Sequence, residues 1–185
     1  IDRVIKAKEE DGRYQNLRRH FGSKCGGKFF YFFQGQALFV LFFSIPFFIV
    51  STNLSPGLVV WDFLAIAIWS IAIVGEWISD KQLASFRSNE VSKETVCKKG
   101  LWKYSRHPNY FFEWLHWWSY VALSVGSPLW WLALIGPIAM WYCLWKVTGI
   151  PYTEVQALKS RGDAYRVYQK TTSPFFPWFP KESTE

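Results

Sequence analysis

Four long apolar runs limit the folds that this chain of 185 residues can adopt. A helix needs roughly 20 apolar residues to cross the hydrocarbon layer of a membrane, and the four runs reach or approach that length. They cover residues 29–50, 58–78, 110–125 and 129–145. Half of all residues are hydrophobic and 21% are aromatic, which is more ring surface than one soluble core of this size can bury. The sequence therefore predicts an all-α, polytopic integral membrane protein with about four transmembrane helices.

Lys and Arg residues are divided unevenly among the segments that flank and connect these runs. Eight lie in residues 1–28, seven in 81–106 and six in 146–185, whereas the connections 51–57 and 126–128 contain none. Four crossings bring the three basic segments to one face of the membrane, and an excess of Lys and Arg marks the cytoplasmic or matrix face. A soluble helical protein would not show this segregation. We therefore expect the endoplasmic reticulum, mitochondrial inner or bacterial inner membrane, with the basic face in the cytoplasm or matrix.

These features divide the chain into three parts. Residues 1–28 are predicted to form a basic amphipathic segment at the cytoplasmic face. Residues 29–145 are predicted to form the transmembrane domain, with a cytoplasmic loop at 79–109, and residues 146–185 a tail at the same face. The chain begins with Ile1 on a charged stretch, so we expect it to be part of something longer.

A polar stripe leads from the middle basic segment into the third apolar run. Pro108 suits the first turn of a helix, because its φ is preset and it has no N–H to donate. Asn109, Glu113, His116 and Tyr120 then follow at spacings of four, three and four residues, so they share one helix face. Ionisable groups inside a membrane are costly without a partner or water, and they usually line a site. Hydrogen bonding between helices is the alternative role for this stripe.

The basic loop before Pro108 also has two interpretations. Lys98, Lys99, Lys103 and Arg106 lie within nine residues of the chain. Such a cluster suits an anionic ligand that carries phosphate groups, and snorkelling to lipid phosphates explains it as readily. The three histidines of the chain are too few for a histidine-rich iron site, so we expect no metal. We expect membrane lipids as partners and no nucleic acid.

The tail continues the polar and aromatic pattern. Pro151 is predicted to begin a helix over residues 153–161 that Gly162 ends, and Asp163 to cap a second helix that extends to residue 170. Prolines at 174, 177 and 180 then exclude further helix and leave an aromatic segment. This tail can fold back over a ligand or lie on the membrane surface, and the sequence favours neither.

Several motifs occur together in a characteristic order. They are Phe86-Arg87-x-Asn89, Gly100-Leu101-Trp102-x-Tyr104-Ser105-Arg106-His107-Pro108-Asn109-Tyr110-Phe111-x-Glu113, Gly136-Pro137, Gly149-x-Pro151-x-x-Glu154 and Tyr165-Arg166-x-Tyr168-Gln169. In this combination the chain resembles the DUF1295 membrane family, which is related to the carboxyl-terminal domain of steroid 5-alpha-reductases. The resemblance covers nearly the whole chain.

The resemblance implies a membrane reductase that binds NADPH at the cytoplasmic face and saturates a C=C bond in a lipid or steroid-like substrate. The positions that match the family's cofactor motifs are Arg87, Tyr104, Arg106, His107, Asn109 and Tyr110, with Glu154, Arg161, Tyr165 and Arg166 in the tail that completes the site. Glu113, near the nicotinamide end, and His116 and Tyr120, deeper in the membrane, are the catalytic candidates. The resemblance also implies further membrane helices before the position of Ile1, which in the steroid reductases supply substrate contacts.

Two other functions fit the same sequence. S-adenosylmethionine-dependent membrane methyltransferases of the isoprenylcysteine or phospholipid type share an Arg-His-Pro-x-Tyr element, but they usually have paired glutamates in the tail. Here Glu154 is followed by Val155. A non-catalytic, lipid-binding subunit of a larger membrane complex is the second alternative. Titration with NADPH and with S-adenosylmethionine distinguishes these functions, because a ligand that binds only the folded state stabilises it.

Overall fold

The structure is a computed structural model that describes residues 12–22, 25–89, 95–147 and 149–181. Helices and loops account for these ranges, and no strand occurs among them, which confirms the all-α prediction. Parts of the three predicted segments lie outside the described residues. These parts are residues 1–11 and 23–24 of the basic segment, 90–94 of the cytoplasmic loop, and 148 and 182–185 of the tail.

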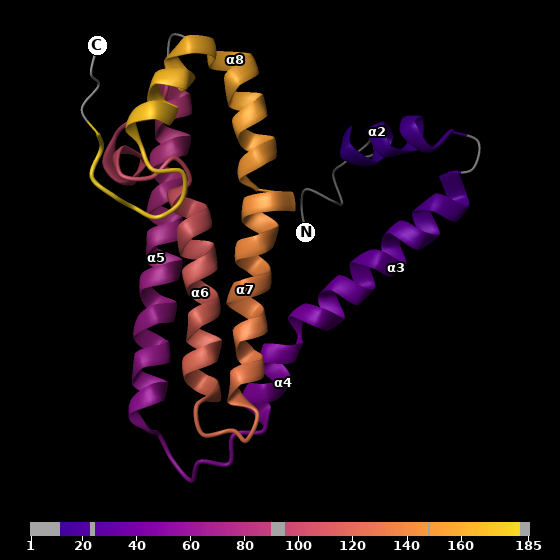
Figure 1. Ribbon diagram of the computed structural model, residues 1–185, viewed down its shortest axis with the longest axis vertical. Coiled ribbons are helices and arrows are strands. Elements are labelled where there is room, and N and C mark those ends of the chain that lie inside the picture. Colours follow the sequence, from indigo (N-terminus) through magenta and orange to yellow (C-terminus); the bar gives the residue numbers. More distant parts are fainter. Residues whose placement is uncertain (1–11, 23–24, 90–94, 148, 182–185) are drawn as a thin grey trace. The chain divides into compact units, whose positions relative to one another are not determined.

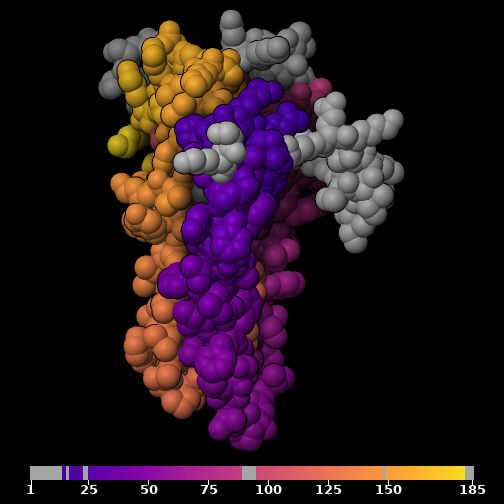
Figure 2. All heavy atoms as spheres, turned by 90° about the vertical axis from the view of Figure 1, so that its right-hand side faces the viewer, coloured from indigo at the N-terminus to yellow at the C-terminus, as the bar shows by residue number. Residues whose placement is uncertain are grey.

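The chain divides into two compact units, Ile1–Ser44 and Ile45–Glu185. The first unit contains α2 (Gly12–Phe21) and α3 (Cys25–Phe43). No described residue of α3 is buried, and Figure 2 draws its side chains as spheres in indigo. Within this unit the rings of Phe29 and Phe33 stack with their centroids 5.9 Å apart. An apolar helix that has no fully buried residue suits a lipid environment.

The second unit contains the remaining helices. They are α4 (Ile45–Ser51), α5 (Val60–Asn89), α6 (Pro108–Ser124), α7 (Ile135–Tyr142) and α8 (Ile150–Thr171), with the 3-10 helices η2 (Gly100–Lys103) and η3 (Trp130–Leu134) and the π-helical turn η4 (Cys143–Val147). Helices α5, α6 and α7 lie side by side in alternating directions (Figure 1). Residues 95–107 and the whole of α8 lie at one end of these three helices, and α4 and η3 lie at the other.

Three helical stretches are long and apolar enough to cross a membrane, so the chain has the character of an integral membrane protein. They are Cys25–Ser51, Val60–Ser88 and Trp130–Thr171. The last comprises 42 residues, about twice the roughly 20 that one crossing needs. Its second half is α8, which carries six charged residues, so we assign the crossing to the segment from η3 to η4 and place α8 outside the membrane. The fourth expected crossing, α6, has 17 residues, the lower limit for a span.

Helices α5 and α6 approach closely at Gly75. A Cβ atom at this position would lie closer than 2.6 Å to three ring atoms of Phe112, so glycine is the residue that allows the contact. The approach places the start of α6 beside the last turns of α5. The first residues of α6 after Pro108 therefore lie next to the residues of α5 after Glu76, as the contact between Asn109 and Asp80 shows.

We expect Gly75→Ala to lower the free energy of unfolding by about 1–3 kcal/mol, because the ring of Phe112 must move to admit a methyl group. The measurement is the thermal unfolding of the purified protein in detergent. Gly35→Ala is the matched control, since Gly35 also lies inside an apolar helix and has no neighbour within 4 Å of the added Cβ. Equal midpoints for the two variants would contradict the close α5–α6 contact.

A cluster of apolar side chains joins the tail to the helical bundle. Leu144, Ile150 and Phe175 are buried together, and Tyr110, Phe111, Trp114, Met140 and Trp145 pack against them. The exposed fraction of Phe175 is 1%. Because Phe175 follows α8, its burial holds the tail against the beginning of α6. The residues of the middle loop, α6 and the tail therefore meet at one end of the bundle.

Candidate functional site

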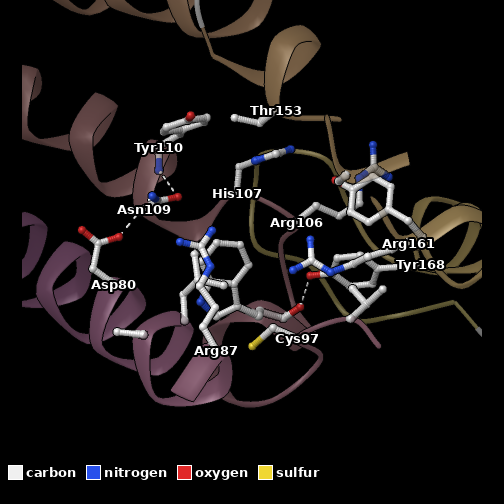
Figure 3. Close-up of a pocket in the computed structure, with 16 residues that line it drawn as sticks. Asp80, Arg87, Cys97, Arg106, His107, Asn109, Tyr110, Thr153, Arg161 and Tyr168 are labelled. Atoms are coloured by element: carbon white, nitrogen blue, oxygen red, sulfur yellow. Dashed lines mark hydrogen bonds between the residues drawn. The ribbon is translucent and has the colours of Figure 1, made fainter. Parts of the chain in front are cut away.

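A cavity of about 420 Å³ lies at this end of the bundle, and we call it the basic-end cavity. Residues of α5, of the chain before α6, of the first turn of α6 and of α8 line it (Figure 3). Three arginines but only one acidic residue, Asp80, occur among the described residues that line it. Its volume falls in the range of roughly 300–1,000 Å³ that is usual for small-molecule sites. Its electrostatic character favours an anion.

Arg87 and Arg161 are the two arginines whose side chains retain donors for a ligand. Arg87 is exposed near the end of α5 and has no hydrogen bond or ion pair with another described residue. Arg161 donates one hydrogen bond, from Nε to the carbonyl oxygen of Thr95 at 2.9 Å. The two side chains lie on opposite sides of the cavity (Figure 3). Their remaining N–H groups suit phosphate oxygens, which guanidinium groups bind in bidentate fashion.

Arg106 has a different role, because the protein itself occupies most of its donors. Its Nε donates to Oε1 of Glu154 at 2.7 Å, and its Nη1 donates to the carbonyl oxygens of Gln169 and Thr172, each at 2.8 Å. Only 8% of the residue is exposed. Arg106 therefore lines the cavity while it ties the turn before α6 to both halves of α8.

Glu154 is the acceptor on which this network converges. Its Oε1 lies 2.7 Å from Nε of Arg106 and 3.4 Å from Nε2 of His107, and its Oε2 accepts a hydrogen bond from Gln169 at 2.9 Å. Burial alone would raise the pKa of this carboxyl group, but the hydrogen bonds and the charge of Arg106 lower it to about 2. A lowered pKa adds stability above the ordinary value of 4.5, and this contribution is lost as the pH falls toward 2.

Two polar pairs lie on the α6 side of the cavity. The rings of His107 and Tyr110 stack with their centroids 5.4 Å apart and their planes 10° apart. Nδ2 of Asn109 donates to Oδ1 of Asp80 at 3.2 Å, and Oδ1 of Asn109 accepts the backbone N–H of Tyr110 at 3.0 Å (Figure 3). The first pair offers a flat aromatic surface, and the second offers carboxylate and amide groups that suit hydroxyls.

The first half of α8 forms one wall of the cavity. Thr153, Ala157 and Arg161 follow one another at intervals of four residues, so they share a helix face, and all three line the cavity. Gly162 has φ +51° and ψ −125°, which kinks α8 after this wall. The tail thus contains two helical segments that meet at a kink at Gly162, as the sequence predicts.

The structure brings seven of the ten predicted cofactor residues to the cavity. They are Arg87, Arg106, His107, Asn109, Tyr110, Arg161 and Tyr165. Glu154 lies behind them as the partner of Arg106. Tyr104 does not line the cavity and packs against Phe179 of the tail, with ring centroids 6.0 Å apart. Arg166 is exposed and pairs with Asp163 at 2.8 Å.

The three catalytic candidates lie deeper along α6. Glu113, His116 and Tyr120 are about 6, 10 and 16 Å from Asn109 along the helix axis. The hydroxyl of Tyr120 lies 3.1 Å from Nε2 of His116, so these two side chains form a pair. None of the three lines the basic-end cavity. Their catalytic roles remain predictions.

Sequence reasoning missed other lining residues, among them Cys97, Thr153 and Ala157. The four-residue spacing that connects Thr153 and Ala157 to Arg161 is a signal that could have identified them, because it places them on one helix face. Cys97 follows a part of the loop that has no periodic pattern, and nothing in the sequence marks it as a lining residue.

Comparison with known proteins identifies a family but no curated relative. A family model that is described as "Protein of unknown function (DUF1295)" matches residues 1–172. A search of curated proteins and a search of solved structures each found no match.

Proposed function

The chain belongs to the DUF1295 family, and we propose that it is a membrane reductase that binds NADPH in the basic-end cavity and reduces a C=C bond of a lipid or steroid-like substrate. The proposal includes the orientation that the charge pattern predicts, with the cavity facing the cytoplasm or the matrix. The observation that carries it is the pair of guanidinium groups, Arg87 and Arg161, with donors left for an anion on opposite sides of one cavity.

The donor set fits the chemistry of NADPH. Arg87 and Arg161 supply positive charge and paired N–H groups for a diphosphate or a 2′-phosphate. Asn109 and Asp80 supply an amide and a carboxylate that suit ribose hydroxyls. The stacked rings of His107 and Tyr110 supply a flat surface against which an aromatic base can pack.

Residues further along α6 suit the proton transfer that must accompany hydride transfer. NADPH supplies a hydride when it is bound, and the protein must orient it and provide a proton. Reduction of a C=C bond places the hydride on one carbon and a proton on the other. Tyr120 and His116, whose polar atoms are 3.1 Å apart, can hold that proton and deliver it as a general acid. The apolar sequence of α6 predicts that they lie at membrane depth, which suits a lipid-soluble substrate.

The alternative methyl donor fits this cavity less well. S-adenosylmethionine carries a sulfonium cation, and a cavity that three arginines and one aspartate line repels a cation. Arg106 is already neutralised by Glu154, but Arg87 and Arg161 still outnumber Asp80. We therefore place methyl transfer second, as an outcome that the ligand experiment can reveal.

The test is thermal unfolding of the purified protein in detergent with NADPH, NADP⁺, NADH or S-adenosylmethionine. We expect NADPH to raise the midpoint by about 5 °C or more at roughly 100 times its Kd, because it binds only the folded state. NADH should have a smaller effect, because it lacks the 2′-phosphate. A shift with S-adenosylmethionine alone would support a methyltransferase. No shift with any of them would favour the non-catalytic lipid-binding subunit.

A further inference from the structure

The tail after α8 is fixed to the protein by its backbone. The N–H of Arg106 donates to the carbonyl oxygen of Ser173 at 2.8 Å, and the N–H of Trp178 donates to that of Tyr104 at 2.9 Å. The N–H of Lys181 donates to the carbonyl oxygen of Thr171 at 2.8 Å. Three backbone hydrogen bonds over nine residues hold this segment in one conformation, although its prolines exclude a helix.

The side chains of this fixed segment fall into two groups. Phe175 is buried, with an exposed fraction of 1%, and it anchors the tail in the apolar cluster. Phe176, Trp178 and Phe179 have exposed fractions of 51%, 71% and 76%. Large exposed rings on a backbone that is already ordered indicate a surface that contacts something apolar.

A second cavity, of about 300 Å³, lies beside these exposed rings, and we call it the tail pocket. Lys170 and Lys181 line it together with Thr171, Ser173, Trp178 and Phe179. Neither lysine ammonium has a hydrogen bond or an ion pair with another residue that the structure describes. The pocket therefore combines two lysines and several hydroxyl groups with an aromatic rim, and Arg106, which is paired with Glu154, also lines it.

The position of the tail along α6 indicates the depth of its exposed rings relative to the membrane. The ring of Phe176 lies 6.1 Å from the ring of Phe111 in α6. The next residue of α6, Phe112, contacts α5 at Gly75. Phe176 is therefore level with the part of α5 just after Gly75. There Nζ of Lys81 lies 4.7 Å from the ring centre of Trp77, a Trp–Lys pair of the kind that marks a membrane interface.

We propose that the tail pocket binds the headgroup of an anionic phospholipid. Lys170 and Lys181 contact its phosphate, the hydroxyl of Ser173 donates a further hydrogen bond to it, and Trp178 and Phe179 pack against the start of the acyl chains. We favour a lipid over a protein segment as the ligand. A single anionic phospholipid has a phosphate for the cations, acyl chains for the aromatic rim and a natural position at the interface. This proposal does not rest on the NADPH site, although Arg106 lines both cavities.

The experiment uses the full chain in detergent, with thermal unfolding as the readout. The added ligands are dioctanoyl phosphatidylglycerol, dioctanoyl phosphatidylcholine and inorganic phosphate. We expect phosphatidylglycerol to stabilise the protein more than either other ligand. In the double variant Lys170→Gln/Lys181→Gln its Kd should rise roughly 30-fold, from the loss of two interfacial charges. The variant Lys99→Gln/Lys159→Gln removes the same charge outside the tail pocket and should keep the wild-type Kd.

Three results would overturn the proposal. Equal stabilisation by both lipids would mean that the pocket does not recognise anionic headgroups. Equal stabilisation by inorganic phosphate would identify an anion site that has no preference for lipid. Equal weakening in the two double variants would mean that net charge, and not the tail pocket, attracts the lipid. Both variants change exposed lysines, so loss of folding does not obscure the comparison.

Discussion

Replacing Arg106 with alanine is expected to lower the free energy of unfolding by about 3–5 kcal/mol, because it leaves the half-buried carboxylate of Glu154 without its charged partner. The side chains of the pair are 9% and 17% exposed, so water replaces little of the lost interaction. The carbonyl oxygens of Gln169 and Thr172 also lose their donor. The tail should detach from the turn before α6, and thermal unfolding in detergent measures the loss.

Arg166→Ala is the matched control for this prediction. Arg166 forms an ion pair of nearly the same length with Asp163, but the two side chains are 68% and 89% exposed. Exposed pairs contribute about 0–1 kcal/mol, so this variant should unfold close to the wild type. A loss of stability in Arg166→Ala as large as that in Arg106→Ala would contradict a stabilising role for the buried Arg106–Glu154 pair.

The double variant Arg87→Gln/Arg161→Gln should raise the Kd for NADPH by roughly 100-fold or more, because hydrogen bonds to charged groups contribute about 1.5–3 kcal/mol each. Arg87 has no partner among the described residues, and Arg161 has one hydrogen bond, to Thr95. The loss should therefore appear mainly in binding and not in folding. Titration of the purified variant with NADPH, followed by tryptophan fluorescence, measures the Kd.

The control for this prediction is Lys99→Gln/Lys159→Gln, which removes two positive charges that do not line the cavity. It should bind NADPH as the wild type does. If both double variants lose affinity equally, the attraction comes from the charge of the whole face and the cavity is not the binding site. If the arginine variant keeps wild-type affinity, the two guanidinium groups have no role in binding.

Hydropathy and local geometry were enough to predict the class of fold. The apolar runs predicted the membrane helices, Pro108 predicted the start of α6, and Gly162 predicted the kink in α8. The fourth run was less predictable, because it is composed of η3, α7 and η4 instead of one regular helix. Its hydropathy is uniform, so the change from 3-10 to α to π geometry has no signal in the pattern of apolar residues.

The interactions within the site were less predictable than the residues that line it. The motif around Arg106 predicted that this side chain would lie at the cavity, and it does. Its partners, Glu154 and the carbonyl oxygens of Gln169 and Thr172, are 48 to 66 residues away in the sequence. Spacing along the chain carries no information about such contacts. A basic residue in a motif can therefore support the fold as well as a ligand.

The most direct test of the central claim is a structure of the protein determined with saturating NADPH. We expect density for the diphosphate or the 2′-phosphate within hydrogen-bonding distance of the guanidinium groups of Arg87 and Arg161. The ion pair between Arg106 and Glu154 should be intact. Acyl-chain density in the basic-end cavity, or NADPH bound elsewhere on the protein, would contradict the central claim.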